Sequence, residues 1–361
     1  MKSVPPDHGS LRTMHIQTEP HRLPRRRTIH LCIVTCMLGG CSGLIDPNVP
    51  EPIHPFIEPE FGGDYQLYRP SNYDRRQGWP LMVICHSTFP DSPNKQLHEW
   101  TQLAETYGFV AVAPQLTRAK RSWRQKEGAR LAALEENERR VLATIRHVRA
   151  SHNISDDRVL IYGWDRGAQT ALHTGLRNPQ QFRAIALTRP RLDDDTLSGT
   201  WTDIDRYQPV QVHYNVSDAI HGGHARSCVK WLRSIGAKVD ENTIGTAAKT
   251  DAVDSVLFFQ RVIRDVPWLH IRAFTSGGRT PLETHFKLKS SFAPTTFRWN
   301  FGDGDESVVA EPVHLYTTSG RYRVSVTVLG QDNTEITRVA EIVVPGARLQ
   351  RASHSDTDAH D

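Results

Sequence analysis

The chain has 361 residues, a formal net charge of +4 at pH 7, 38% hydrophobic residues and 23% charged residues. This composition is that of an ordinary globular protein, and the length leaves room for about two domains and a leader. Part of the small positive charge lies in Arg25–Arg27, so no broad basic surface for nucleic acid is predicted. Of the five cysteines, three lie between Cys32 and Cys41, and Cys85 and Cys228 are too far apart in sequence to indicate a disulfide scaffold.

Residues 1–41 have the pattern of an export signal. A polar, basic stretch precedes an apolar run, Ile29–Leu38, that is too short to span a bilayer. The sequence Leu38-Gly39-Gly40-Cys41 resembles a bacterial lipobox, and this resemblance implies that Cys41 carries lipid in the mature protein. We therefore expect an exported, lipid-anchored protein of the cell envelope, in the outer membrane if the cell has one, or an extracellular protein. The alternative is an ordinary signal with a chance cysteine.

A stretch rich in proline and glutamate follows, and it predicts an extended tether over residues 42–62. Over residues 63–272 buried apolar runs alternate with amphipathic helical patterns. This alternation predicts an α/β domain in which a doubly wound, mostly parallel sheet has helices on both faces.

Within this domain, Gly163-Trp164-Asp165-Arg166-Gly167 lies between an apolar run and a helical run. A strand, a tight turn flanked by glycines and a helix form the nucleophile elbow of serine hydrolases, written G-x-S-x-G. The nucleophile position here holds Asp165. The elbow, together with Pro80–His86 and the segment from Val210 through Asp218 to Leu232, resembles an α/β-hydrolase. The most similar members are esterases related to polyhydroxybutyrate depolymerases and feruloyl esterases, over about residues 65–268.

The resemblance implies roles for several side chains. Asp218 occupies the position of the triad acid, while His86, Ser87 and Arg166 belong to the oxyanion region, where Ser87 replaces the usual glycine. The triad histidine is expected within residues 245–251, but this segment contains none. Its Lys249 would act as a base only after strong desolvation.

Two functions follow from this pattern. In the first, the domain is a catalytically degenerate esterase that serves binding or scaffolding, because both the serine and the histidine are absent. In the second, Asp165 is the nucleophile of an esterase-, dehalogenase- or epoxide-hydrolase-like enzyme, which requires a histidine from elsewhere. His221 and His224 lie close to Asp218 in sequence, and the pattern favours ordinary surface positions for both.

No metal or other cofactor is predicted. The spacing of His213, His221 and His224 matches no zinc pattern, and Asp193–Asp195 is typical of a solvated loop rather than a calcium site.

Residues 273–345 predict a second, all-β domain. Short alternating runs such as Tyr322–Val328 indicate half-buried antiparallel strands of a small immunoglobulin-like sandwich. The turn Trp299–Gly304 and the segment Pro312–Tyr316 resemble the PKD domain, which implies an extracellular spacer or a binding module for polysaccharide, cell wall or protein. Residues 346–361 have the composition of a disordered tail.

Overall fold

The computed structural model describes residues 52–87, 92–117, 127–191, 204–205, 208–244, 251–276, 278, 280–331 and 333–346. Expectations for Cys41, Asp193–Asp195, Lys249 and the tail beyond residue 346 lie outside these residues. No helix among the described residues is long and apolar enough to cross a membrane.

An eight-stranded sheet forms the centre of the first domain, with the strand order β1-β2-β4-β3-β5-β6-β7-β8. The antiparallel strand β2 joins β1 to β4, and the strands from β4 to β8 in this order pair in parallel. The strands are β1 (His54–Ile57), β2 (Asp64–Tyr68), β3 (Trp79–Cys85), β4 (Val110–Pro114), β5 (Ile154–Trp164), β6 (Ala184–Thr188), β7 (Pro209–Asn215) and β8 (Lys238–Ile244).

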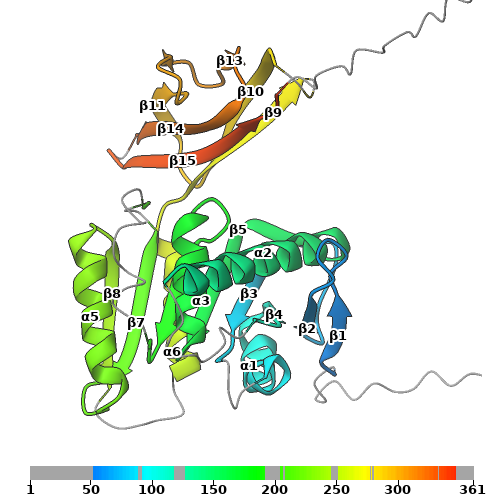
Figure 1. Cartoon of the computed structure of the whole chain (residues 1–361), viewed down its shortest axis with the longest axis vertical. Helices are drawn as coiled ribbons and strands as arrows, with labels where there is room; N and C mark the ends of the chain where they lie inside the picture. The colour runs from blue at the N-terminus through cyan, green and yellow to red at the C-terminus, as the bar shows by residue number, and fades with distance from the viewer. Residues whose placement is uncertain are drawn as a thin grey trace, which may run out of the picture. The chain divides into compact units, whose positions relative to one another are not determined.

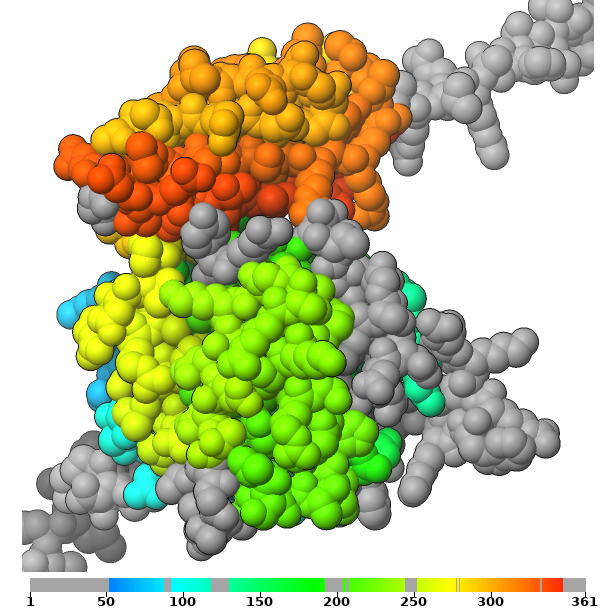
Figure 2. Space-filling model, turned by 90° about the vertical axis from the view of Figure 1, so that its left-hand side faces the viewer, coloured from blue at the N-terminus to red at the C-terminus, as the bar shows by residue number. Residues whose placement is uncertain are grey.

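Helices cover both faces of this sheet (Figure 1). They are α1 (Pro93–Tyr107), α2 (Glu127–Ser151), α3 (Gly167–Arg177), α5 (His221–Ser234) and α6 (Asp251–Asp265). Alternate strand residues pack either against α2, α3 and α5 or against α1 and α6, because successive side chains of a strand point to opposite faces. Figure 2 shows the side of the first domain on which α5 (yellow-green) lies. This helix packs on β7 and β8. The predicted α/β-hydrolase fold is confirmed.

The predicted tether is wrong in part. Residues His54–Ile57 form β1, which pairs with Asp64–Leu67 of β2 as the edge of the sheet. The turn between the two strands is held by Glu58, whose buried carboxylate accepts hydrogen bonds from the backbone N–H groups of Glu60, Phe61 and Gly63. The hydrolase domain therefore includes residues from at least His54, not from residue 63.

The second domain consists of two antiparallel sheets, with the strand orders β13-β10-β9 and β12-β11-β14-β15. Its strands are β9 (Leu269–Ser276), β10 (Leu282–Ser290), β11 (Pro294–Asn300), β12 (Glu306–Ser307), β13 (Val313–Tyr316), β14 (Gly320–Gly330) and β15 (Glu335–Val344). Trp299 and Phe301 are buried in the core between the sheets, together with the alternating valines of β14. The predicted sandwich is confirmed.

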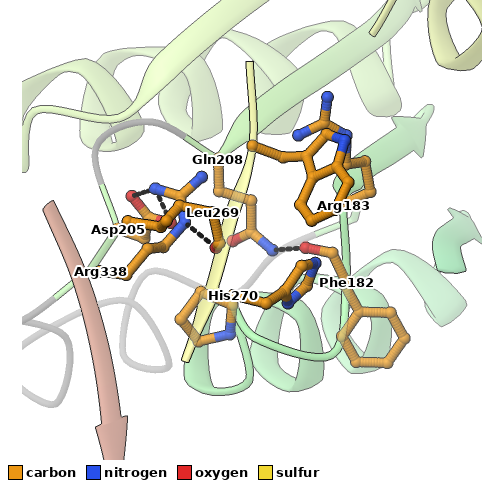
Figure 3. A pocket seen from close by; sticks show the side chains of 9 residues that line it. Phe182, Arg183, Asp205, Gln208, Leu269, His270 and Arg338 are labelled. Carbon is orange, nitrogen blue, oxygen red and sulfur yellow. Dashed lines mark hydrogen bonds and ion pairs between the residues drawn. The ribbon is translucent and has the colours of Figure 1, made fainter. Parts of the chain in front are cut away.

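A buried ion pair lies next to the start of β9. Arg338 of β15 points at Asp205, with a distance of 2.6 Å from Nη1 to Oδ2, and both side chains are almost fully buried (Figure 3). Gln208 donates a hydrogen bond of 2.8 Å from Nε2 to the Phe182 carbonyl beside this pair. His270 lines the same small cavity, whose volume is about 10 Å³.

We expect His270 to make the protein less stable in acid. Burial, followed by the positive charges of Arg338 and Arg183, lowers the pKa of His270 from 6.5 to about 4. The unfolded chain therefore binds one more proton between these pH values, so the free energy of unfolding decreases as the pH falls from 6.5 to 4, by about 3 kcal/mol. Denaturant unfolding at pH 7 and pH 4.5 should show a smaller decrease in His270→Gln than in the wild type. An equal decrease in both proteins would contradict the prediction.

Candidate active site

The turn after β5 holds Asp165 in a backbone conformation that side chains rarely adopt. Its φ is +50°, in the left-handed region, and its backbone N–H donates to the Thr188 carbonyl at 3.1 Å. The two flanking glycines permit this turn: a Cβ on Gly163 would lie 2.6 Å from the Cα of Ala168, and a Cβ on Gly167 would lie 2.0 Å from the Cys85 carbonyl oxygen. The nucleophile elbow predicted from the sequence is thus present, with a carboxylate at its apex.

Asp218 and His221 lie at the start of α5, and they orient each other. The Asp218 Oδ1 atom accepts hydrogen bonds of 2.9 Å from the backbone N–H groups of Ile220 and His221. Its Oδ2 atom lies 2.9 Å from Nδ1 of the His221 ring. The hydrogen bond from the His221 backbone N–H lowers the pKa of Asp218 most. Burial acts in the opposite direction, and the hydrogen bond from the His221 ring lowers the pKa further. This carboxylate therefore stays ionised and fixes the ring with Nδ1 as donor.

The other ring nitrogen of His221 faces the elbow. Nε2 lies 3.3 Å from Oδ1 of Asp165, and the side chains of His221 and Asp165 are only 21% and 14% exposed. The chain Asp165–His221–Asp218 reproduces the nucleophile, base and orienting acid of a hydrolase triad.

The prediction that His221 is an ordinary surface residue, and that no imidazole reaches the elbow, is therefore wrong. In the resemblance the base follows β8, whereas here it comes from the first residue of the helix that follows β7. A histidine three residues after an acid that precedes a helix is the signal that could have identified it, since such an acid accepts hydrogen bonds from the first N–H groups at the helix start.

Ser87 contacts the elbow carboxylate from the other side. Its hydroxyl donates a hydrogen bond of 2.8 Å to Oδ2 of Asp165, and the residue is fully buried. His86 points away from the elbow, since its Nε2 atom accepts from the Leu116 N–H at 3.2 Å and its Nδ1 atom lies 2.7 Å from the Ser87 carbonyl. Of the predicted oxyanion residues, Ser87 thus contacts Asp165, and His86 bonds within its own loop and to Leu116. Arg166 is exposed and contributes the first backbone N–H after the elbow.

Another histidine named from the sequence lies beside a different carboxylate. His213 is fully buried on β7, and its Nδ1 atom lies 3.7 Å from Oδ2 of Asp254. Among the described residues the one group of potential metal ligands is Asp303, Asp305 and His314 in the second domain. There the His314 ring stacks on Phe301 and hydrogen-bonds Asp303 at 2.7 Å, which is a structural use of both side chains.

Replacing Gly167, the second glycine of the elbow, by alanine tests how tightly the elbow packs against Cys85. Because no space exists between Gly167 and Cys85, we expect Gly167→Ala to lower the free energy of unfolding by about 3 kcal/mol or more. Gly223→Ala is the control, since a Cβ there meets no atom within 4 Å and α5 gains a better helix former. In denaturant unfolding, Gly167→Ala should have a lower free energy of unfolding than the wild type. The free energy of unfolding of Gly223→Ala should equal or exceed that of the wild type. Equal stability of the two variants would contradict the packing described above.

Residues 268–344 match the family model of the PKD domain, so the second domain is a PKD domain that begins a few residues before the predicted boundary. No curated protein matches the chain. Among solved structures, the CE1 ferulic acid esterase AmCE1/Fae1A of Anaeromyces mucronatus is 11% identical, with coverage of 58% of this chain and 88% of that chain and a TM-score of 0.47.

An esterase of Pyrobaculum calidifontis is 13% identical, with coverage of 60% and 86% and a TM-score of 0.46. The PKD1 domain of Epp from Vibrio anguillarum is 24% identical, covers 22% of this chain and 95% of its own, and has a TM-score of 0.20. At these identities and scores the similarity does not extend to activity or substrate.

Proposed function

We propose that the α/β-hydrolase domain is a hydrolase in which Asp165 forms a covalent ester with the substrate. The observation that carries the proposal is the His221 ring, held by Asp218 with its Nε2 atom 3.3 Å from the elbow carboxylate. The degenerate-esterase hypothesis rested on the absence of both the serine and the histidine, and the position of His221 supports a base in place of the missing histidine.

The chemistry of a carboxylate nucleophile restricts the substrate. Attack on an ester carbonyl would give an anhydride, which is no more stable than the ester that was cleaved. Attack on a saturated carbon instead displaces a leaving group with its electron pair and forms an alkyl ester of Asp165. The substrates that fit are therefore alkyl halides or epoxides. A halide is the simplest leaving group, because it departs without a proton.

The second half-reaction regenerates the carboxylate. His221 accepts a proton at Nε2 from a water molecule, and the resulting hydroxide attacks the ester carbonyl carbon of Asp165. The oxyanion forms beside the N-terminus of α3, where the Arg166 N–H and the helix dipole favour negative charge. Its collapse releases the alcohol, whose oxygen comes from Asp165, and the water oxygen remains in the carboxylate.

Ser87 holds Asp165 during both steps. By donating to Oδ2, its hydroxyl fixes the carboxylate plane and leaves Oδ1 on the side of His221. We assign Ser87 a positioning role, because a fully buried hydroxyl does not meet the substrate.

The decisive test uses 1-bromobutane, with styrene oxide and p-nitrophenyl acetate for comparison. We expect the wild type to release bromide, and Asp165→Asn to reduce the rate about 10³-fold or more. His221→Gln should stop after the first step, because the ester then lacks its base. Mass spectrometry of the intact protein should show one added butyl group in this variant, located on Asp165 by peptide mapping.

His224→Gln is the control, since it removes a histidine three residues further along the same helix and should leave bromide release unchanged. If the wild type releases no bromide from 1-bromobutane and His221→Gln gains no butyl group, Asp165 is not a nucleophile.

One observation favours a second candidate, the non-catalytic binding domain. Both carboxylate oxygens of Asp165 already face partners, Ser87 and His221, and the side chain is 14% exposed. In that case the three polar groups would serve only to stabilise the turn. Asp165→Asn would then lower stability without changing any turnover, an outcome that the same assays distinguish.

The proposal includes the location of the protein. The export signal and the Cys41 lipobox support a lipid-anchored envelope protein, in which the PKD domain serves as a spacer or binds polysaccharide, cell wall or protein. We expect Cys41→Ser to abolish metabolic labelling with radioactive palmitate and to release the protein from the membrane fraction. Unchanged labelling of the variant would refute the anchor.

A further inference from the structure

A second cavity lies near the amino-terminal ends of β3 and β5, whereas Asp165 follows the carboxyl end of β5. It has a volume of about 390 Å³ and is lined by Gln77, Gly78, Trp79, Pro80, Tyr107, Gly108, Arg158, Gln260 and Ile263. These residues come from the amino-terminal start of β3, the end of α1, the first half of β5 and the middle of α6. Asp165 follows the carboxyl end of β5, so the cavity is separate from the candidate active site. Its volume lies in the range of about 300–1,000 Å³ that ligand pockets occupy.

The floor of this cavity is apolar. An adjoining space of about 30 Å³ shares Pro80, Tyr107, Gly108, Gln260 and Ile263 with it. The other residues around this space are the buried side chains of Met82, Phe109, Leu160, Val256 and Phe259. A small space with such a lining excludes water and accepts the end of an apolar group.

The mouth of the cavity carries the polar groups. Gln77, Arg158 and Gln260 are exposed there, and Arg158 is the single charged residue among the residues that line it. The Arg158 side chain is 44% exposed, and its Nε atom lies 3.7 Å from Oδ2 of Asp157, beyond hydrogen-bond distance. Its guanidinium makes no hydrogen bond to another described residue, so its donors remain available to a ligand.

We propose that this cavity binds an amphiphilic carboxylate, a carboxylic acid with a short alkyl chain. The chain enters the apolar floor between α1 and α6. The carboxylate pairs with Arg158, because a guanidinium offers the parallel donors that match a carboxylate. The amides of Gln77 and Gln260 can donate further hydrogen bonds at the rim. A cationic ligand is disfavoured because the described residues that line the cavity include no acidic side chain.

The experiment is isothermal titration calorimetry of the full chain with three ligands that share one tail: octanoate, octan-1-ol and octylammonium, at equal ionic strength. We expect saturable binding of octanoate at one site, weaker binding of octan-1-ol and no binding of octylammonium. Arg158→Gln should weaken octanoate about tenfold, the effect of one charge-assisted hydrogen-bonding group, and should leave octan-1-ol unchanged.

Gln260→Trp fills the mouth from an exposed position on α6 and should abolish binding of both octanoate and octan-1-ol. Arg261→Gln is the matched control: it removes one positive charge from the same helix outside the cavity lining and should leave both affinities unchanged. Melting temperatures confirm that each variant is folded. The proposal would be overturned if Arg158→Gln and Gln260→Trp both left the affinity for octanoate unchanged. It would also be overturned if octylammonium bound as tightly as octanoate. Asp165→Asn should not affect it, so the result is independent of the proposed hydrolase activity.

Discussion

The hydrogen bonds between Asp218 and the first turn of α5 are the interactions on which the candidate site depends. They hold an ionised carboxylate against two backbone N–H groups and one ring nitrogen. This arrangement directs the opposite ring nitrogen of His221 at Asp165. Without it, the ring would not be held with Nε2 at 3.3 Å from the elbow carboxylate.

The fold could be predicted from the sequence because buried strands and amphipathic helices alternate regularly. Strands such as β4 and β6 are buried at every position and contribute to both cores, so they form continuous apolar runs in the sequence. The edge strand β1 was missed because all four of its side chains are exposed, which leaves no such pattern in a segment rich in proline. The glycine turn around Trp299–Gly304 and the alternating valines of β14 were sufficient to predict the second domain.

The candidate site could be predicted in part. Asp165 and Asp218 occupy the positions that the chain order of an α/β-hydrolase assigns to them, and both contact the same ring. His221 was missed because its place was assigned from family order rather than from local geometry. Helix α5 begins at His221, three residues after Asp218, and the Asp218 carboxylate accepts from the N–H groups of Ile220 and His221 there. Only the position of the helix start reveals this proximity.

Because Asp218 accepts hydrogen bonds from the backbone at the start of α5, its carboxylate and the His221 ring are held to the same helix end. Any tilt of this helix carries both groups together, so the spacing between them stays fixed while the gap to the elbow widens or narrows.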